Sequence, residues 1–181
     1  MRIFFMSDIH GSSVYLRLAL EAFNSEKCDA IAILGDIMYH GPRNPLPEGY
    51  NPAEVASIIN DYASKITAVR GNCDSEVDQM LIKYPMMDSS AVILADNRKF
   101  FLTHGHICSP EKLPALNPGD IFAYGHTHIP AAYETDGIYI FNPGSTTLPK
   151  SSHMPSYGIY AENSLSVKSL EGEVILTLPL K

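Results

Sequence analysis

The sequence predicts a mixed α/β fold in which two β-sheets pack face to face and helices cover their outer sides. Two patterns and the chain length point to this fold class. Before Pro85, short apolar segments alternate with helical patterns, as they do where helices join parallel strands. After Pro85, closely spaced strands and turns follow, which is typical of antiparallel pairing. The 181 residues contain no linker, so we expect a single domain over residues 1–181.

The first half of the chain contains three apolar segments that we expect to be buried parallel strands. These segments are Arg2–Ser7, Ala30–Leu34 and Ile66–Arg70. Ser12 or Ser13 can cap a helix after the first strand, because a serine oxygen accepts a hydrogen bond from the free N–H groups at a helix start. The segment from His40 to Asn51 contains three prolines and is therefore expected to be a loop.

Two further helices are predicted before Pro85, one between the second and third strands and one after the third strand. Asn51 and Pro52 begin the first of them, with asparagine as the cap and proline in the first turn. Ser75 can cap the second, whose apolar residues recur at helical spacing and would form one buried face. That face is expected to comprise Val77, Met80, Leu81 and Tyr84.

The second half of the chain is expected to consist of strands. Asp96-Asn97-Arg98 separates two of them and predicts a hairpin. The expected strands are Ala91–Ala95, Lys99–Thr103, Ile121–Tyr124, Ala131–Glu134, Ile138–Phe141, Ser156–Ala161, Leu165–Leu170 and Val174–Leu178.

The composition excludes several classes of protein. No apolar run approaches the ~18 residues of a membrane-spanning helix, so we expect no membrane partner. The formal charge of −7 and the lack of a Lys/Arg run argue against extended nucleic acid as a partner, because its phosphates would need cations. Three widely spaced cysteines without a CxxC pair predict a cytoplasmic location and no thiolate zinc site. The oligomeric state stays open, with a homo-oligomer among the alternatives.

Polar residues directly follow five of the predicted strands. They are Asp8, His10, Asp36, Asn72, His104, His126 and His128. Carboxyl ends of parallel strands meet at one edge of a sheet, where ligands bind in open α/β sheets. Two carboxylates, four imidazoles and one carboxamide suit manganese, iron, zinc or nickel. Seven ligands are too many for one tetrahedral zinc but suit two metals that share a carboxylate.

Each of these short blocks has an ordinary explanation when it is taken alone. Asp8-x-His10 and Gly35-Asp36 are common turn sequences, and a single histidine such as His104 is usually a surface or core residue. Five such blocks in one order, each after an apolar strand, are improbable as a coincidence. The conjunction therefore favours a metal site.

The same blocks, in the same order, resemble the ligand blocks of calcineurin-like metallophosphoesterases. The short chain, Gly71-Asn72-Cys73-Asp74 and Asn142-Pro-Gly-Ser145 are similar to the small bacterial and archaeal phosphodiesterases of that family. The resemblance implies a four-layer sandwich of two mixed β-sheets flanked by helices. It also implies that Asp36 bridges two metals. The first metal would be held by Asp8, His10, Asp36 and His128, and the second by Asp36, Asn72, His104 and His126.

The resemblance implies a hydrolase for small phosphate diesters, in which a metal-bridging hydroxide attacks phosphorus directly. We expect two divalent ions, with manganese favoured over zinc, iron or nickel. Two alternatives stay open: a phosphomonoesterase or nucleotidase of the same fold, and a non-catalytic protein-binding scaffold like the retromer subunit that resembles these enzymes.

No catalytic side chain is assigned with certainty. Many family members have a histidine where this chain has Cys73, and a thiol suits leaving-group protonation less well. His106 is an alternative contributor if it faces the metals, although a supporting or surface role explains it at least as well. Arg70 is another, although a surface salt bridge explains Arg70 slightly better. Asn72 and Arg43 are the candidate substrate contacts, Arg43 because its proline-rich loop follows Asp36 closely.

Overall fold

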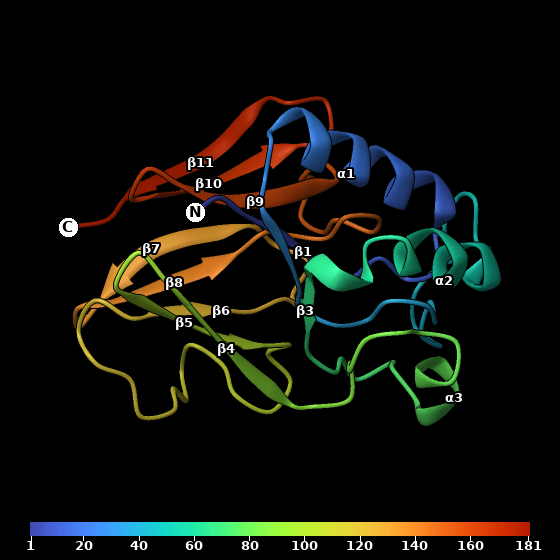
Figure 1. The fold of residues 1–181 in the computed structure, drawn as a ribbon, viewed down its shortest axis with the longest axis horizontal. Coiled ribbons are helices and arrows are strands. Elements are labelled where there is room, and N and C mark those ends of the chain that lie inside the picture. Colours follow the sequence, from blue (N-terminus) through green and yellow to red (C-terminus); the bar gives the residue numbers. More distant parts are fainter.

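The computed structural model describes residues 1–181 and contains two mixed β-sheets that lie face to face (Figure 1). The six-stranded sheet has the order β11-β10-β9-β1-β2-β3. The strands β1, β2 and β3 are parallel, while β9, β10 and β11 extend the sheet with antiparallel pairs. Its strands are β1 (Ile3–Met6), β2 (Ala30–Ile33), β3 (Ile66–Ala68), β9 (Ser156–Ala161), β10 (Ser164–Ser169) and β11 (Val174–Pro179).

The five-stranded sheet has the order β4-β5-β6-β8-β7. Parallel pairs join β5, β6 and β8, whereas the edge strands β4 and β7 are antiparallel to their neighbours. Its strands are β4 (Ser90–Ala95), β5 (Arg98–Thr103), β6 (Ile121–Ala123), β7 (Ala131–Thr135) and β8 (Ile138–Asn142). The predicted fold class of two mixed sheets is therefore confirmed.

Helices cover the outer face of the six-stranded sheet. They are α1 (Ser13–Ser25) and α2 (Pro52–Asn60). The 3-10 turn η1 (Ala63–Lys65) precedes β3, and the short α3 (Glu76–Gln79), which has no buried residue, follows it. Ser12 caps α1 by accepting a hydrogen bond from the backbone N–H of Tyr15 at 3.2 Å. Asn51 caps α2 by accepting one from the N–H of Glu54 at 3.2 Å. Both predicted helix starts are confirmed. None of the helices is long and apolar enough to cross a membrane.

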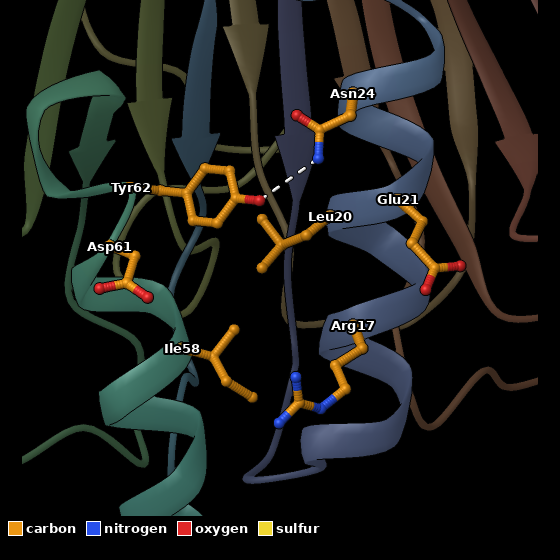
Figure 2. Close-up of a pocket in the computed structure, with 7 residues that line it drawn as sticks. All are labelled: Arg17, Leu20, Glu21, Asn24, Ile58, Asp61 and Tyr62. Atoms are coloured by element: carbon orange, nitrogen blue, oxygen red, sulfur yellow. Dashed lines mark hydrogen bonds between the residues drawn. The ribbon is translucent and has the colours of Figure 1, made fainter.

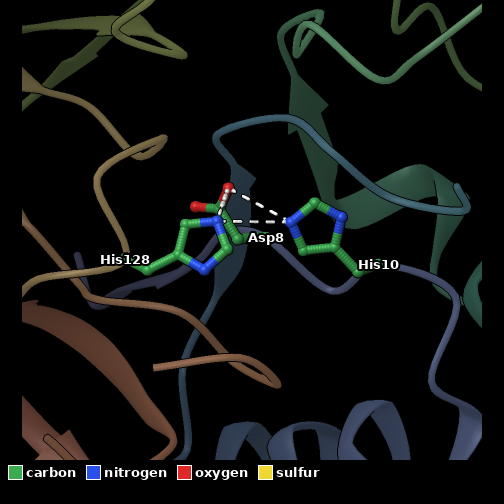
Figure 3. Close-up of side chains that lie close together, drawn as sticks. All are labelled: Asp8, His10 and His128. Atoms are coloured by element: carbon green, nitrogen blue, oxygen red, sulfur yellow. Dashed lines mark hydrogen bonds and ion pairs between the residues drawn. The ribbon is translucent and has the colours of Figure 1, made fainter. Parts of the chain in front are cut away.

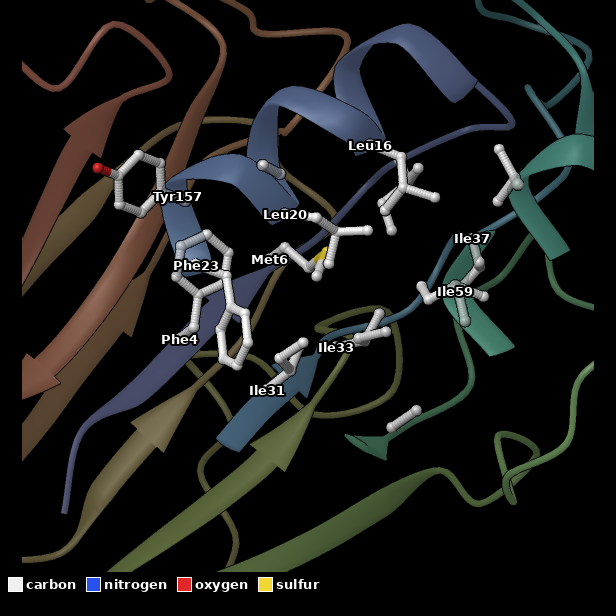
Figure 4. Close-up of a cluster of buried hydrophobic side chains, with 14 of the residues drawn as sticks. Phe4, Met6, Leu16, Leu20, Phe23, Ile31, Ile33, Ile37, Ile59 and Tyr157 are labelled. Atoms are coloured by element: carbon white, nitrogen blue, oxygen red, sulfur yellow. The ribbon is translucent and has the colours of Figure 1, made fainter. Parts of the chain in front are cut away.

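Alternating side chains of β1 serve two separate cores. Phe4 points toward the helices, where its ring stacks on Tyr157 at 4.8 Å and meets the edge of Phe23 at 5.8 Å (Figure 4). Phe5 points the other way, and its ring lies 5.3 Å from that of Phe141 in the second sheet. Burial of each such side chain contributes about 1.5–3 kcal/mol. The two sheets are therefore held in a fixed relation, which also fixes the loops at their ends.

The outer face of the five-stranded sheet is covered by an irregular segment, not by a helix. Phe122 and Ile140 are buried on this face, and Leu113 and Leu116 pack against their cluster. The segment 104–120 therefore serves as a covering layer while it also carries His104 and His106.

The third predicted helix is much shorter than its apolar pattern indicates, and its predicted buried face is wrong. Val77, Met80 and Leu81 are exposed by 66%, 84% and 52%. The chain instead buries Ile82, Tyr84 and Met86 while Lys83 and Pro85 stay exposed. This period of two belongs to an extended segment, and it competes with the helical spacing that the same apolar residues also satisfy.

Candidate metal centre

The seven predicted ligands lie at the ends of five strands that the two sheets bring to one edge. Asp8 and His10 follow β1, Asp36 follows β2, Asn72 follows β3, His104 follows β5, and His126 and His128 follow β6. The arrangement predicted from the carboxyl ends of the strands is thus present in the fold.

Five of these residues have a left-handed backbone, which L side chains rarely adopt. Their φ angles lie between 49° and 65°. Such a conformation costs on the order of 1–3 kcal/mol per residue and persists where surrounding contacts enforce it. The residues concerned are Asp8, His10, Asp36, His126 and His128. This concentration of strain marks the edge as a functional site.

Asp8, His10 and His128 point their ligand atoms at one another (Figure 3). The Nε2 atom of His128 lies 3.2 Å from Oδ1 of Asp8 and 3.3 Å from Nε2 of His10. Asp8 is fully buried, yet its Oδ1 has no hydrogen-bond donor. An unpartnered carboxylate oxygen facing two imidazole nitrogens suits a bound cation.

Three of the histidines are oriented by backbone carbonyls. The Nδ1 atom lies 2.9 Å from the carbonyl of Tyr39 in His10, 2.6 Å from that of Leu34 in His104, and 2.5 Å from that of Leu148 in His128. Nδ1–H donation to a carbonyl leaves the Nε2 lone pair free for a metal and fixes the ring orientation. In all three residues Nε2 is the nitrogen that faces the carboxylates.

Asp36 lies between two groups of ligand atoms. Its Oδ2 is 3.8 Å from Nε2 of His10 and 3.4 Å from Nε2 of His104. On the far side, Nε2 of His104 is 3.1 Å from Oδ1 of Asn72. These distances place Asp36 where one carboxylate could contact two ions.

His126 lies at the margin of the cluster. Its ring centroid is 5.1 Å from that of His104. Its backbone N–H donates to Oδ2 of Asp8 at 3.0 Å. The side chain belongs to none of the three groups whose ligand atoms lie within 4.8 Å of one another, whereas Cys73 does, with His10 and Asp36.

The charges of the site favour an added positive charge. Burial disfavours the imidazolium of His104, but the Asp36 and Asp8 carboxylates outweigh this and raise its pKa to about 9. Burial also disfavours the charged form of Asp8 and would raise its pKa, but the surrounding histidines hold that pKa well below its usual range. The residues present therefore fit divalent cations, which satisfy the same demand for positive charge.

Asp74 is an essential part of the architecture that sequence reasoning missed. Its Oδ2 accepts hydrogen bonds from the backbone N–H groups of Asp36 at 2.8 Å and Gly71 at 2.7 Å, and its Oδ1 accepts one from Ile37 at 2.8 Å. Burial raises the pKa of Asp74 to about 6. One carboxylate thus joins the Asp36 loop to the Asn72 loop. Its only signal in the sequence is its place two residues after Asn72.

Asn142 and Ser145 support the ligand loops from beneath. The Asn142 amide donates to the carbonyl of Gly125 at 2.9 Å and to the hydroxyl of Thr127 at 3.1 Å. The Ser145 hydroxyl donates to the carbonyl of Asp8 at 2.9 Å. The Asn142-Pro-Gly-Ser145 segment therefore holds both the His126–His128 loop and the Asp8 loop.

Two cavities flank Asn72 and Cys73. One, of about 320 Å³, is lined by Cys73, His126 and His128 together with Arg43 and Lys150. Lys150 was not identified from the sequence, because nothing near it in the chain marks it as close to the candidate ligands.

The second cavity, of about 560 Å³, is lined by Asn72, Arg70 and His106. The Arg70 side chain also donates to the carbonyl of Asp74 at 3.2 Å and lies 3.8 Å from Glu76. Burial and the charge of His104 lower the pKa of His106, and the two rings are 5.3 Å apart.

A third cavity, of about 280 Å³, lies between α1 and α2 (Figure 2). The Asn24 amide donates to the Tyr62 hydroxyl there at 3.3 Å. None of the predicted ligands lines this cavity. Its wall consists of Arg17, Leu20, Glu21, Asn24, Ile58, Asp61 and Tyr62.

Residues 1–164 match the family model of the calcineurin-like phosphoesterase superfamily domain. The chain belongs to this superfamily. It is therefore a phosphoric ester hydrolase from a family that uses divalent metal ions.

Two curated relatives are similar in sequence to this phosphoesterase over most of its length. Phosphodiesterase YfcE of Escherichia coli K12 is 48% identical over 176 residues, which are 97% of this chain and 96% of the relative. Phosphodiesterase MJ0936 of Methanocaldococcus jannaschii is 29% identical over 152 residues, which are 80% of this chain and 83% of the relative.

Solved structures confirm the metallophosphoesterase fold. That of YfcE, described as a phosphoesterase from E. coli, has a TM-score of 0.98 at 46% identity and covers 100% of both chains. Vps29 of Entamoeba histolytica complexed with zinc has a TM-score of 0.65 at 21% identity and covers 98% of both chains. The second likeness concerns the fold alone.

Proposed function

We propose that this phosphoesterase hydrolyses small phosphate diesters with two divalent metal ions. The observation that carries the proposal is the position of Asp36 between two ligand groups, Asp8–His10–His128 on one side and His104–Asn72 on the other. When bound, two such ions supply an activated water and offset the growing negative charge of the phosphate. The first ion is assigned to Asp8, His10, Asp36 and His128, and the second to Asp36, Asn72, His104 and His126.

The protein contributes orientation, charge and hydrogen bonds to this chemistry. The carbonyl-anchored histidines present Nε2 without further rearrangement, which reduces the cost of forming the site. Asn72 is exposed beside the cluster, and its amide group can donate to a phosphate oxygen. Its Oδ1 contact with His104 holds the amide in place.

Cys73 favours diesters with good leaving groups. Burial and the Asp36 carboxylate raise the pKa of the Cys73 thiol to about 12, so at neutral pH this group is an uncharged thiol. It is accordingly a weak nucleophile and a weak acid for a departing alkoxide. A substrate that needs no protonated leaving group is least affected by this, and both curated relatives described above are named phosphodiesterases.

Manganese is the proposed metal, with zinc, iron and nickel as alternatives suited to the same imidazole and carboxylate ligands. The three free cysteines fit the proposed reducing cytoplasm. The acidic chain fits a small phosphate ester as the partner and not extended nucleic acid. A homo-oligomer is compatible with the exposed apolar residues.

The test is metal-dependent hydrolysis of two aryl substrates, bis(nitrophenyl) phosphate and nitrophenyl phosphate. Chelation should abolish diester hydrolysis, manganese should restore it, and metal analysis should find about two ions per chain. Asp36→Asn should lose metal and activity together, whereas Asp136→Asn, in an exposed turn, should keep both. Activity that survives chelation would overturn the metal mechanism, and faster monoester hydrolysis would identify a phosphomonoesterase. If the purified protein holds no metal and binds another protein tightly, the result would support a non-catalytic protein-binding scaffold instead.

A further inference from the structure

The cavity beside His126 and His128 has a cationic wall. Its charged residues are Arg43 and Lys150, and no acidic residue lines it. Its volume of about 320 Å³ is comparable to that of small-ligand sites, which begin at roughly 300 Å³. The remaining wall residues are Gly41, Pro42, Asn44 and Cys73.

Neither cation is paired with a carboxylate, although acidic residues outnumber basic ones by 20 to 13. Other cations of the chain do have such partners, for example Arg17 at 2.7 Å from Glu54 and Lys99 at 2.8 Å from Asp120. The positive charges of Arg43 and Lys150 are therefore available to a ligand.

Both cations belong to segments that are anchored to the metal centre. The backbone N–H of Lys150 donates to the carbonyl of His128 at 3.2 Å. The Arg43 loop packs on Cys73, since a Cβ built on Gly41 would lie 3.0 Å from its sulfur. The Asn44 amide closes this loop by donating to the carbonyl of His40 at 2.8 Å. Arg43 and Lys150 are far apart in the sequence, and their charges thus flank the metal ligands in the folded chain.

We propose that Arg43 and Lys150 form an anion subsite for a second negatively charged group, carried on one ester arm of the substrate. The inference rests on the proposed function, because the scissile phosphate must lie at the metal centre for its arm to enter the cavity. The preferred substrates are then diesters in which one alcohol bears a carboxylate or a phosphate. A guanidinium binds either group with two parallel hydrogen bonds, and the lysine adds a point charge.

Three nitrophenyl diesters test the subsite on the manganese-loaded, full-length enzyme. They share the leaving group and differ only in the other arm, a propyl chain that ends in methyl, carboxylate or phosphate. The readout is the ratio of kcat/KM for each anionic diester to kcat/KM for the neutral one, which cancels effects on the chemical step. Carboxylate and phosphate arms together identify which anion the subsite prefers.

The wild-type enzyme should prefer an anionic arm roughly tenfold or more, and added salt should reduce the preference. Arg43→Gln and Lys150→Gln should each lower the ratio about threefold to tenfold, and the double variant should bring it close to one. Lys27→Gln is the matched control, because Lys27 is exposed in the turn before β2, at the end of the strand opposite the metal centre. It should retain the wild-type ratio.

Calorimetry supplies a readout that does not depend on turnover. Propanediol bisphosphate should bind the manganese-loaded wild type about tenfold more tightly than propyl phosphate, and the double variant should bind both alike. Equal kcat/KM for neutral and anionic arms in an active wild type would overturn the subsite while leaving the proposed function intact. Arg43 and Lys150 variants that lower all three rates equally would also overturn the subsite and leave the proposed function intact, because the two side chains would then contact the scissile phosphate. Absence of metal-dependent hydrolysis of any diester would instead contradict the proposed function.

Discussion

The buried carboxylate of Asp74 accepts a hydrogen bond from the backbone N–H of Asp36 at 2.8 Å. The same oxygen accepts a second from Gly71, and the other oxygen accepts a third from Ile37. All three donors belong to the loops that carry Asp36 and Asn72, so Asp74 fixes the distance between residues assigned to two metals. Asp74 is a positioning residue that acts through other side chains.

Asp74→Asn should weaken metal binding and stability together. An asparagine offers one acceptor oxygen and places an N–H₂ group against backbone donors, so at least one buried N–H loses its partner. We expect the free energy of unfolding to fall by about 2–4 kcal/mol, and the metal affinity to fall about tenfold or more. Urea unfolding and a competitive metal titration measure the two effects. Asp136→Asn removes the same charge from an exposed turn and should change neither. Wild-type metal affinity in folded Asp74→Asn would contradict the positioning role.

The positions of the candidate ligands in the fold could be predicted from the sequence because each follows an apolar strand. Asp8 and Asp36 are local in this sense, since the strand and the loop are read from the same few residues. The role of Asp74 could not be predicted, because its three partners come together only when two loops fold against each other. The position of Lys150 could not be predicted for the same reason, since its backbone hydrogen bond to His128 forms only in the folded chain.

The error at α3 has a different physical origin. Val77, Met80 and Leu81 satisfy a helical period, but a helix of four residues has too little surface to bury them. Tyr84 was assigned to that helical face, whereas it is buried by the extended segment that follows. Competition between two periods within one short apolar segment is decided by tertiary packing, which the local pattern does not contain.

Metal removal should lower thermal stability as well as activity. The ligand cluster concentrates two buried carboxylates that lack counter-charges other than histidines, so an ion that binds only the folded state adds to the free energy of unfolding. Manganese at a hundredfold excess over its Kd contributes about 2.7 kcal/mol, which corresponds to roughly 5–10 °C in Tm. Differential scanning calorimetry with and without chelator checks this. The shift should shrink in His10→Ala, which lacks a ligand of the first ion, and persist in full in Asp136→Asn. A metal-independent Tm for the wild type would contradict metal binding by this cluster.

Cys73→His should change which leaving groups the enzyme accepts. An imidazole at this position can protonate a departing alkoxide near neutral pH, whereas the Cys73 thiol, with its pKa raised to about 12, does so poorly. The ratio of kcat/KM for an alkyl diester to that for a nitrophenyl diester should rise about tenfold, and the monoester-to-diester preference should shift with it. Cys73→Ser introduces no comparable acid and should leave both ratios near those of the wild type. Unchanged ratios in Cys73→His would show that this position does not serve the leaving group.

Tyr84→Phe should reduce the loss of stability at alkaline pH. The Tyr84 hydroxyl is buried without a hydrogen-bond partner, and burial, with a smaller contribution from Asp74, raises the pKa of Tyr84 above its usual value. The unfolded chain ionises this group near its ordinary pKa of about 10, while the folded chain does not, so its contribution to stability is complete below pH ~10 and falls as the pH rises further. The slope of this loss is about 1.4 kcal/mol per pH unit for one such group. Urea unfolding at pH 8 and pH 11 should therefore show a smaller difference in the free energy of unfolding in Tyr84→Phe than in the wild type.

At pH 8 the free energy of unfolding of the variant should equal or exceed that of the wild type, because phenylalanine leaves no buried hydroxyl unpaired. Since the chain has 10 tyrosines and no tryptophan, ultraviolet absorbance follows tyrosine ionisation directly, and equal alkaline titration of Tyr84 in the native and urea-unfolded states would contradict the raised pKa.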